Sequence, residues 1–260
     1  MTTIVDCPQS GRGQWNFRLF GASVRVSFWF WIALLLLNSN RGPAGEVIWV
    51  AVCFVSILLH EMGHVFAFRF FRRDASVVLY GFGGMAIPDR DVDGPFPAAV
   101  VAVAGPIAGF CLAGLTLAAA SLTGGSVYFS RHMFLPHLTA MLNYRMLLWP
   151  HGVSLYSHAI ILVNDLLFVN FYWGLVNLLP VWPLDGGHIV RALFEQWDGY
   201  DGRRKSLIVS AVVGGAVALA GFASGSMWLA IMFAIFAVSS LQSMQGAGRR
   251  VIPAYRRWRD

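Results

Sequence analysis

The sequence predicts an all-α polytopic membrane protein with about six transmembrane helices and one short re-entrant β-hairpin. Composition is the first observation behind this fold class: 57% of the 260 residues are hydrophobic and only 12% are charged, whereas soluble proteins are about 25% charged. The second observation is that the apolar residues fall into long runs of the kind that cross a bilayer. The third is that the basic residues gather at the ends of these runs, as they do in membrane proteins.

Six apolar runs are expected to cross the membrane. They lie at about residues 24–37, 46–71, 96–122, 156–179, 207–222 and 227–244. The first is short for a crossing unless it meets a thinned membrane. These runs divide the chain into a cytoplasmic N-terminal arm at residues 1–23, a membrane domain at residues 24–244 with its core at residues 46–197, and a basic cytoplasmic tail at residues 245–260. The tail is expected to lie on an anionic membrane surface.

The basic residues also set the expected orientation. With six crossings, every lysine and arginine except Arg41, Arg131 and Arg145 falls on the side of the two termini. Such an asymmetry places both termini in the cytoplasm, and the expected location is the plasma (inner) membrane of a bacterium. The formal charge of +6 does not indicate a nucleic-acid partner, because the basic residues form no aromatic-interleaved surface.

Two other patterns are expected to be structural. Cys7, Cys53 and Cys111 are isolated in the sequence, so they indicate neither a disulfide framework nor a cysteine-ligated metal. Gly105 and Gly109, in the third run, have the GxxxG spacing that permits close packing of helices.

Residues 75–88 predict the hairpin, because two short β-type runs flank a glycine cluster. Irregular backbone near a membrane persists only where it is buried in protein or lines a wet cavity. The segment is therefore either an ordinary surface loop or an edge strand that pairs with an extended peptide. The residues alone favour neither interpretation.

The motif around which the chain is organised lies within the second run. Residues 60–64 read His-Glu-Met-Gly-His, which fits the H-E-x-x-H pattern. On a helix, His60 and His64 project from the same face, so both imidazoles can bind one metal ion. Glu61 stands beside that metal, where its carboxylate can accept a proton from metal-bound water. Ionisable groups at bilayer depth are costly unless they bind or pair, so a zinc (Zn²⁺) site is favoured over two histidines packed by chance.

A catalytic zinc needs a third protein ligand and an open position for water. Besides Glu61, two acidic residues lie at membrane depth or in broken backbone beside it, Asp165 and Asp185. Asp185 follows a helix break predicted by two prolines at the cytoplasmic end of the fourth run, near the expected depth of His64. Asp185 is therefore favoured. Asp165 remains a competitor, because intramembrane carboxylates usually have a partner.

Together these motifs resemble the site-2 protease family of intramembrane zinc metalloproteases. The resemblance rests on His-Glu-Met-Gly-His at residues 60–64, Asn-Leu-Leu-Pro at residues 177–180 and Pro-Leu-Asp-Gly-Gly at residues 183–187. It extends from the second run through the fourth. The order of the paired motifs makes the match far more specific than H-E-x-x-H alone.

The resemblance implies roles for individual residues. His60, His64 and Asp185 would be the zinc ligands, Glu61 the catalytic base, and Asn177 a group near the substrate or the oxyanion. The glycine hairpin, with Gly83 and Gly84, lies where the family has a re-entrant strand that binds substrate. No stretch is long or polar enough for the PDZ or CBS domains that some members carry.

The expected function is hydrolysis of peptide bonds within or near transmembrane segments, as in regulated intramembrane proteolysis. The expected partners are a transmembrane protein substrate and the lipid bilayer, and the sequence names no regulator or oligomeric state. Two rival functions stay open. One is a membrane zinc hydrolase that acts on lipid-linked substrates, and the other is a non-catalytic metal-binding membrane protein.

Overall fold

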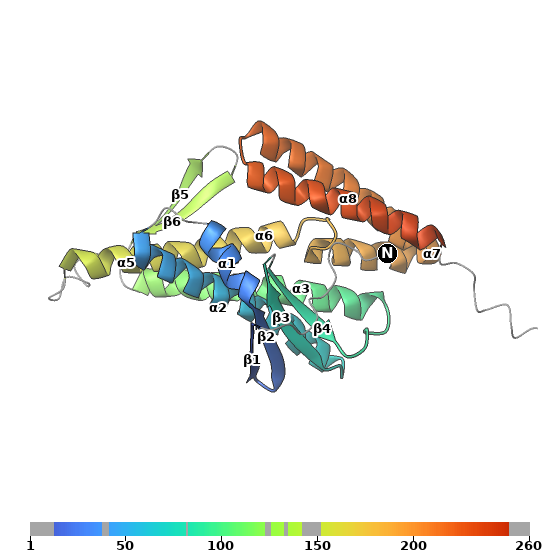
Figure 1. Cartoon of the computed structure of the whole chain (residues 1–260), viewed down its shortest axis with the longest axis horizontal. Coiled ribbons are helices and arrows are strands. Elements are labelled where there is room, and N and C mark those ends of the chain that lie inside the picture. Colours follow the sequence, from blue (N-terminus) through green and yellow to red (C-terminus); the bar gives the residue numbers. More distant parts are fainter. Residues whose placement is uncertain are drawn as a thin grey trace, which may run out of the picture. The chain divides into compact units, whose positions relative to one another are not determined.

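The computed structural model describes residues 13–37, 42–81, 83–122, 126–132, 135–141 and 152–249 (Figure 1). Most of these residues are helical, and five helices within them are long and apolar enough to cross a membrane. The five are Gly42–Phe70, Pro95–Leu122, Ser157–Asn177, Asp201–Ala223 and Met227–Met244. Of the prediction of an all-α membrane protein with about six spans, the coarser part is confirmed: the described residues are mostly helical with five candidate membrane spans, and they also contain a small sheet. Residues 1–12 and 250–260, which hold most of the expected arm and tail, lie outside the described residues.

The first predicted span, at residues 24–37, is not a single helix. Strand β2 occupies Ala22–Ser27, and helix α1 follows at Phe28–Leu37. A ten-residue α-helix is about 15 Å long, half of the roughly 30 Å hydrocarbon core. The burial of β2 alternates along Ala-Ser-Val-Arg-Val because successive strand residues point to opposite faces. The aromatic residues that follow β2 make residues 24–37 one continuous apolar segment, so the alternation did not indicate a separate strand.

A four-stranded sheet contains the predicted hairpin. Its strands are β1 (Gln14–Leu19), β2, β3 (Ala75–Tyr80) and β4 (Gly83–Pro88), in the order β1-β2-β3-β4. The two outer pairings are antiparallel, and β2 pairs with β3 in parallel. The hairpin expected at residues 75–88 is therefore present as β3–β4. The strands at residues 14–27, partly in the expected arm, were not predicted. Strand β1 pairs with β2, and β2 joins the hairpin through β3, which lies some fifty residues further along the chain.

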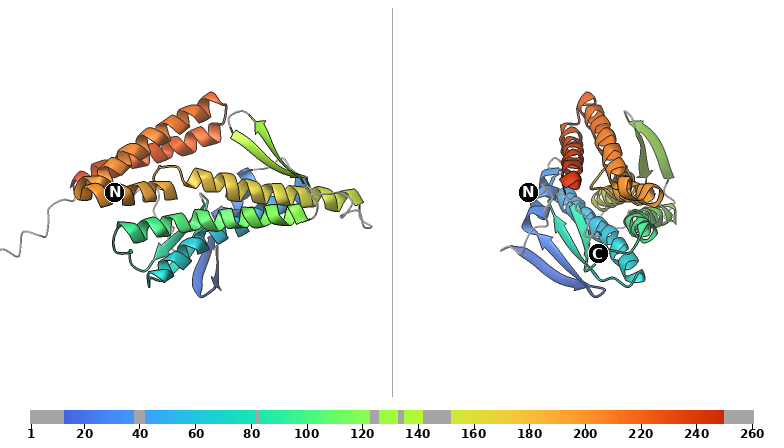
Figure 2. Two further views of the ribbon diagram at one scale, coloured as in Figure 1. Left: turned by 180° about the vertical axis from the view of Figure 1, so that it is seen from behind. Right: turned by 90° about the vertical axis from the view of Figure 1, so that its right-hand side faces the viewer.

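By compactness the chain divides into two units. The first unit comprises the described residues within 93–102 and 178–260, and the second those within 8–92 and 103–177. The second unit holds the sheet, α1, α2 (Gly42–Phe70), most of α3 (Pro95–Leu122) and α5 (Gly152–Leu167). It also holds the hairpin β5–β6 (Ser126–His132 and Leu135–Met141). Helices α2, α3 and α5 run side by side in Figures 1 and 2.

The helical segment at residues 152–177 changes from α-helical to π-helical geometry before it ends. Helix α5 continues into a π-helical segment, η1 (Phe168–Trp173), and then into the single turn α6 (Gly174–Asn177). Leu167 and Tyr172 of this helical segment are buried against Ala113 and Ala120 of α3. Asn177 is the last helical residue before the proline-containing loop that the sequence predicted as a helix break.

The first unit is built on a helical hairpin. Helix α7 (Asp185–Ala223) is antiparallel to α8 (Met227–Arg249), as Figure 2 shows. A break at Gly199, where φ is 44° and ψ is −99°, separates the first turns of α7 from its membrane-length part. The first segment of α7 thus runs from Asp185 to this break.

Candidate metal centre

The two motif histidines lie on one buried face of α2. His60 and His64 are four residues apart on this helix, and they are only 9% and 7% exposed. Glu61, between them in sequence, is 5% exposed. The surrounding apolar residues favour burial of this face of the helix. Burial of the three ionisable side chains costs free energy unless they bind an ion or pair with another group. The motif therefore lies in protein, away from the lipid-facing side of the helix.

The geometry of the histidine pair fits a zinc ion. The Nε2 atoms of His60 and His64 lie 3.2 Å apart, so both rings direct the same nitrogen toward one point. Two nitrogens at Zn–N distances of about 2.0–2.1 Å in a tetrahedral site are separated by roughly 3.3 Å. The observed separation matches that value. The pair can therefore share one tetrahedral ion without rearrangement of α2.

Gly105 of α3 forms the wall of this site, a role that the sequence did not reveal. A Cβ atom at Gly105 would overlap the imidazole of His64 and would lie 2.7 Å from Nε2 of His60. One turn along α2, a Cβ at Gly63 would lie 2.5 Å from the carbonyl oxygen of Ala104. The GxxxG spacing correctly indicated close packing of α3. Which groups Gly105 faces depends on how two distant helices meet, so no local pattern could identify them.

Glu61 contacts the edge of the sheet. A Cβ atom at Gly84 of β4 would lie 2.5 Å from Cγ and 2.6 Å from Oε1 of the Glu61 side chain. Gly83, the preceding residue, has a backbone φ of 134°, which residues with a side chain rarely adopt. No atom lies within 4 Å of the position that a Cβ would occupy there. Thus β4 passes directly beside the carboxylate, with open space at the start of the strand.

Asn177 reaches the histidine pair from the end of α6. Its Nδ2 atom lies 3.4 Å from Nε2 of His60. That nitrogen is the one that His60 would use for a metal, so the amide stands next to the metal position. An amide N–H placed there can donate a hydrogen bond to an oxygen that develops negative charge during a reaction.

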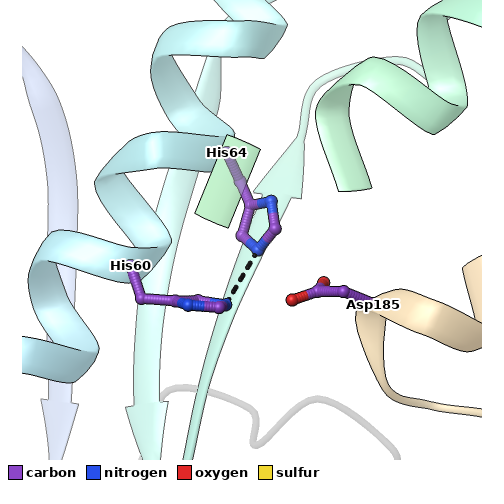
Figure 3. Close-up of side chains that lie close together, drawn as sticks. All are labelled: His60, His64 and Asp185. Atoms are coloured by element: carbon purple, nitrogen blue, oxygen red, sulfur yellow. Dashed lines mark hydrogen bonds between the residues drawn. The ribbon is translucent and has the colours of Figure 1, made fainter. Parts of the chain in front are cut away.

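Asp185 is the first residue of α7, directly after the loop that follows Asn177. The ligand atoms of His60, His64 and Asp185 all lie within 4.8 Å of one another, and Figure 3 shows the three side chains converging. Within the described ranges, this is the group of histidine, cysteine and acidic residues that could hold a metal ion. Asp165, the competing candidate, is buried in α5 and does not belong to this group. Two nitrogens and a carboxylate are a donor set that suits zinc.

Fold and donor set together define a class, the polytopic membrane proteins with a zinc-type site built on an H-E-x-x-H helix. The sequence profile of Peptidase family M50 matches residues 48–221, well over half of the chain. The chain belongs to Peptidase family M50.

Individual relatives agree with this membership. A zinc metalloprotease of Methanocaldococcus jannaschii is 24% identical over 208 residues, which are 78% of this chain and 51% of that protein. Rip3 of Mycobacterium tuberculosis, which is named a zinc metalloprotease, is 29% identical over 229 residues. The match covers 81% of this chain and 51% of Rip3. The chain therefore spans about half the length of the curated relatives it matches.

A solved structure shares the fold. The site-2 protease from Methanocaldococcus jannaschii superposes with a TM-score of 0.54 and 19% sequence identity. The match covers 89% of this chain and 95% of that one. The resemblance inferred from the sequence motifs is thereby confirmed at the level of the family and the fold.

Proposed function

We propose that this protein is an intramembrane zinc metalloprotease that hydrolyses peptide bonds within or near transmembrane segments of membrane protein substrates. The observation that carries the proposal is the convergence of the His60, His64 and Asp185 ligand atoms within 4.8 Å, with Glu61 next in sequence to the first of them. These groups belong to a chain whose long helices are apolar enough to cross a membrane. Membership of Peptidase family M50 supports the same reaction.

Each polar group has a proposed task. Bound zinc would lower the pKa of a coordinated water toward about 7 and polarise the scissile carbonyl. Glu61 accepts the proton of the attacking water and passes it to the leaving amine. Asn177 donates a hydrogen bond to the oxygen that becomes negative as the carbonyl is attacked. His60, His64 and Asp185 would hold the ion.

Strand β4 is the proposed binding edge for substrate. It is an outer strand of the sheet, so its free edge can pair with an extended peptide. Since Gly84 lies against Glu61, a peptide paired there would have its backbone beside the proposed base. A substrate helix hides its carbonyl groups in its own hydrogen bonds, and strand pairing would hold the unwound segment open. Gly83 and Gly84 would keep this approach free of side chains.

Three contacts support the proposal that the sheet is re-entrant and that the chain crosses six times. Arg69, at the basic end of α2, donates a hydrogen bond to the carbonyl of Phe20 at 2.6 Å. Gly84, near the hairpin tip, lies at the level of Glu61. Trp49, near the start of α2, donates to the carbonyl of Leu34 in α1 at 3.2 Å. Strand β2 and α1 would therefore make the first crossing together, β2 through one half of the membrane and α1 through the other.

This composite first crossing preserves the expected orientation. With four further crossings after α2, both termini return to the side of Arg69, Arg72 and Arg73. The positive-inside rule makes that side the cytoplasm. We propose on this basis a multi-pass protein of the bacterial plasma membrane, with a membrane domain at residues 24–244 between cytoplasmic ends.

The test is cleavage of transmembrane peptides by the purified full chain and by Glu61→Gln, with zinc measured in both. We expect Glu61→Gln to lower kcat by about 10²–10⁴-fold while zinc content stays the same, because this is the contribution of a general base. Cleavage of lipid-linked substrates but not of peptides would favour the rival hydrolase. Zinc binding without any hydrolysis, indifferent to Glu61→Gln, would favour a non-catalytic protein.

A second variant tests the binding edge. Gly84→Ala should displace the Glu61 carboxylate or the strand, because the added carbon would lie 2.5 Å from Cγ of Glu61. We expect loss of most cleavage with zinc content unchanged. Normal cleavage by Gly84→Ala would contradict the placement of β4 beside the base.

A further inference from the structure

Asn170 links the helical segment at residues 152–177 to α2, the helix that carries the His-Glu-Met-Gly-His motif. It lies in η1 and is only 3% exposed, and its Nδ2 donates hydrogen bonds of 2.8 Å to Oγ of Ser56 and 2.8 Å to the carbonyl of Leu166. Ser56 is 2% exposed and lies on α2 one helical turn before His60. The bond between Asn170 and Ser56 therefore ties η1 to the same face of α2 that presents the histidines.

A third helix closes on the same point. A Cβ atom at Gly109 of α3 would lie 3.4 Å from the backbone oxygen and 3.7 Å from Oδ1 of Asn170. A glycine there lets α3 approach Asn170 closely, as Gly105 lets it approach the histidines one turn earlier. Asn170 is thus enclosed by α2 and α3, with its amide donor committed across the helix interface.

The helical geometry between Asn170 and Asn177 gives this tie a consequence. A π-helical turn bonds each N–H to the carbonyl five residues back, so it holds one more residue than an α-helical turn. If η1 relaxed to α-helix, everything after it would rotate by about 100°, the turn of one α-helical residue. Asn177 follows η1 by four residues and lies 3.4 Å from His60 only in the present phase. A group that holds η1 in register with α2 therefore decides where the Asn177 amide points.

We infer that Asn170 is a positioning residue for Asn177. Through Ser56 it holds the π-helical segment against α2, so that the Asn177 amide stays beside the nitrogen with which His60 would bind the metal. The inference rests on the proposed function, because it assigns Asn177 a part in the reaction. A purely structural role would instead predict loss of stability without a specific effect on the group at position 177.

The kinetic test is a double-mutant cycle in the full-length protein. Asn170→Leu keeps nearly the same side-chain size but removes the donor, and Asn177→Ala removes the amide itself. We expect kcat to fall about tenfold in Asn170→Leu and about a hundredfold in Asn177→Ala, with KM for a transmembrane peptide and zinc content within twofold of wild type. The double variant should be no slower than Asn177→Ala alone. Independent, multiplicative losses would overturn the inference.

A spectroscopic test reads the same geometry without any substrate. Asn177→Cys in the Co²⁺-loaded protein should bring a thiolate to the metal and produce a thiolate-to-cobalt charge-transfer band. Adding Asn170→Leu should remove most of that band. A band that persists in the double variant, or no band in Asn177→Cys alone, would overturn the inference. If the wild type cleaves no peptide, the proposed function fails while the band still decides the role of Asn170.

Thr116→Val is the matched control. Thr116 is 7% exposed, and its hydroxyl donates at 2.8 Å to the carbonyl of Leu112 within its own helix, α3. Thr116→Val therefore removes a buried hydroxyl of the second unit whose hydrogen bond stays within one helix. We expect wild-type kinetics from Thr116→Val, and a wild-type band when it is combined with Asn177→Cys. A loss as large as that of Asn170→Leu would show that any buried polar deletion disturbs position 177, and would overturn the inference.

Discussion

The two parts of the candidate metal centre are built in opposite ways. The histidines come from one regular helix, in which the i, i+4 spacing alone places both rings on one face. Asp185 instead follows an irregular loop and opens α7. Regular hydrogen bonding fixes α2 from within, whereas the loop needs partners from elsewhere in its unit. Local sequence therefore determines the first part, and packing determines the second.

The loop before Asp185 is held by α7 itself. The backbone N–H of Trp182 donates to Oγ of Ser210 at 3.1 Å, and Ser210 is only 2% exposed. A Cβ atom at Gly187 would lie 2.7 Å from the backbone nitrogen of Trp182, so the loop backbone lies directly on the first turn of the helix. The position of Asp185 thus depends on a serine more than twenty residues away in the chain.

The largest expected effect separates the three proposed ligands from Asp165, the competing candidate. We expect His64→Ala and Asp185→Ala each to lower zinc affinity by more than the roughly 10–100-fold that follows loss of an outer-shell partner, and to abolish cleavage. Asp165→Asn should retain zinc. The measurement is zinc content after dialysis against a graded series of chelator concentrations. Loss of zinc in Asp165→Asn but not in Asp185→Ala would reverse the assignment of the third ligand.

The next effect concerns the wall beside the histidines. Gly105→Ala adds a carbon that would overlap the His64 ring, and overpacking costs about 1–3 kcal/mol. We expect zinc affinity to fall by about 10–100-fold, since each 1.4 kcal/mol is a factor of ten. Gly114→Ala on the same helix is the control, because no atom lies within 4 Å of its would-be Cβ position. Equal zinc affinities in the two variants would contradict the close approach of α3.

The smallest effect concerns the loop. Ser210→Ala leaves the Trp182 N–H without its acceptor, which costs about 1–3 kcal/mol for a buried group. We expect a lower Tm and a zinc affinity reduced by up to about tenfold. Ser240→Ala is the matched control, because Ser240 is 0% exposed and its hydroxyl donates at 2.9 Å to the carbonyl of Phe236 in its own helix. A drop in Tm equal to that of Ser240→Ala, with normal zinc affinity, would show that Ser210 does not support the loop.

The first span shows where sequence reasoning about the fold failed. Residues 24–37 are apolar enough to suggest one helix, yet β2 occupies their beginning because it pairs with β3. Hydrophobicity reports burial and not the partner that makes the backbone hydrogen bonds. Near a membrane, an apolar segment can form either a helix or a strand that pairs with a neighbouring sheet, because both satisfy the backbone hydrogen bonds.

The sequence by itself determined the membrane setting, the long apolar helices and the His60–His64 pair, because these depend on composition and on spacing within one element. Only the tertiary structure brought Gly105 against the histidines, Gly84 against Glu61, and Asn170 against Ser56. Each of these contacts joins elements that are far apart in the chain. Their residue types, glycine and asparagine, are compatible with many roles, so the role is decided by the neighbour that folding supplies.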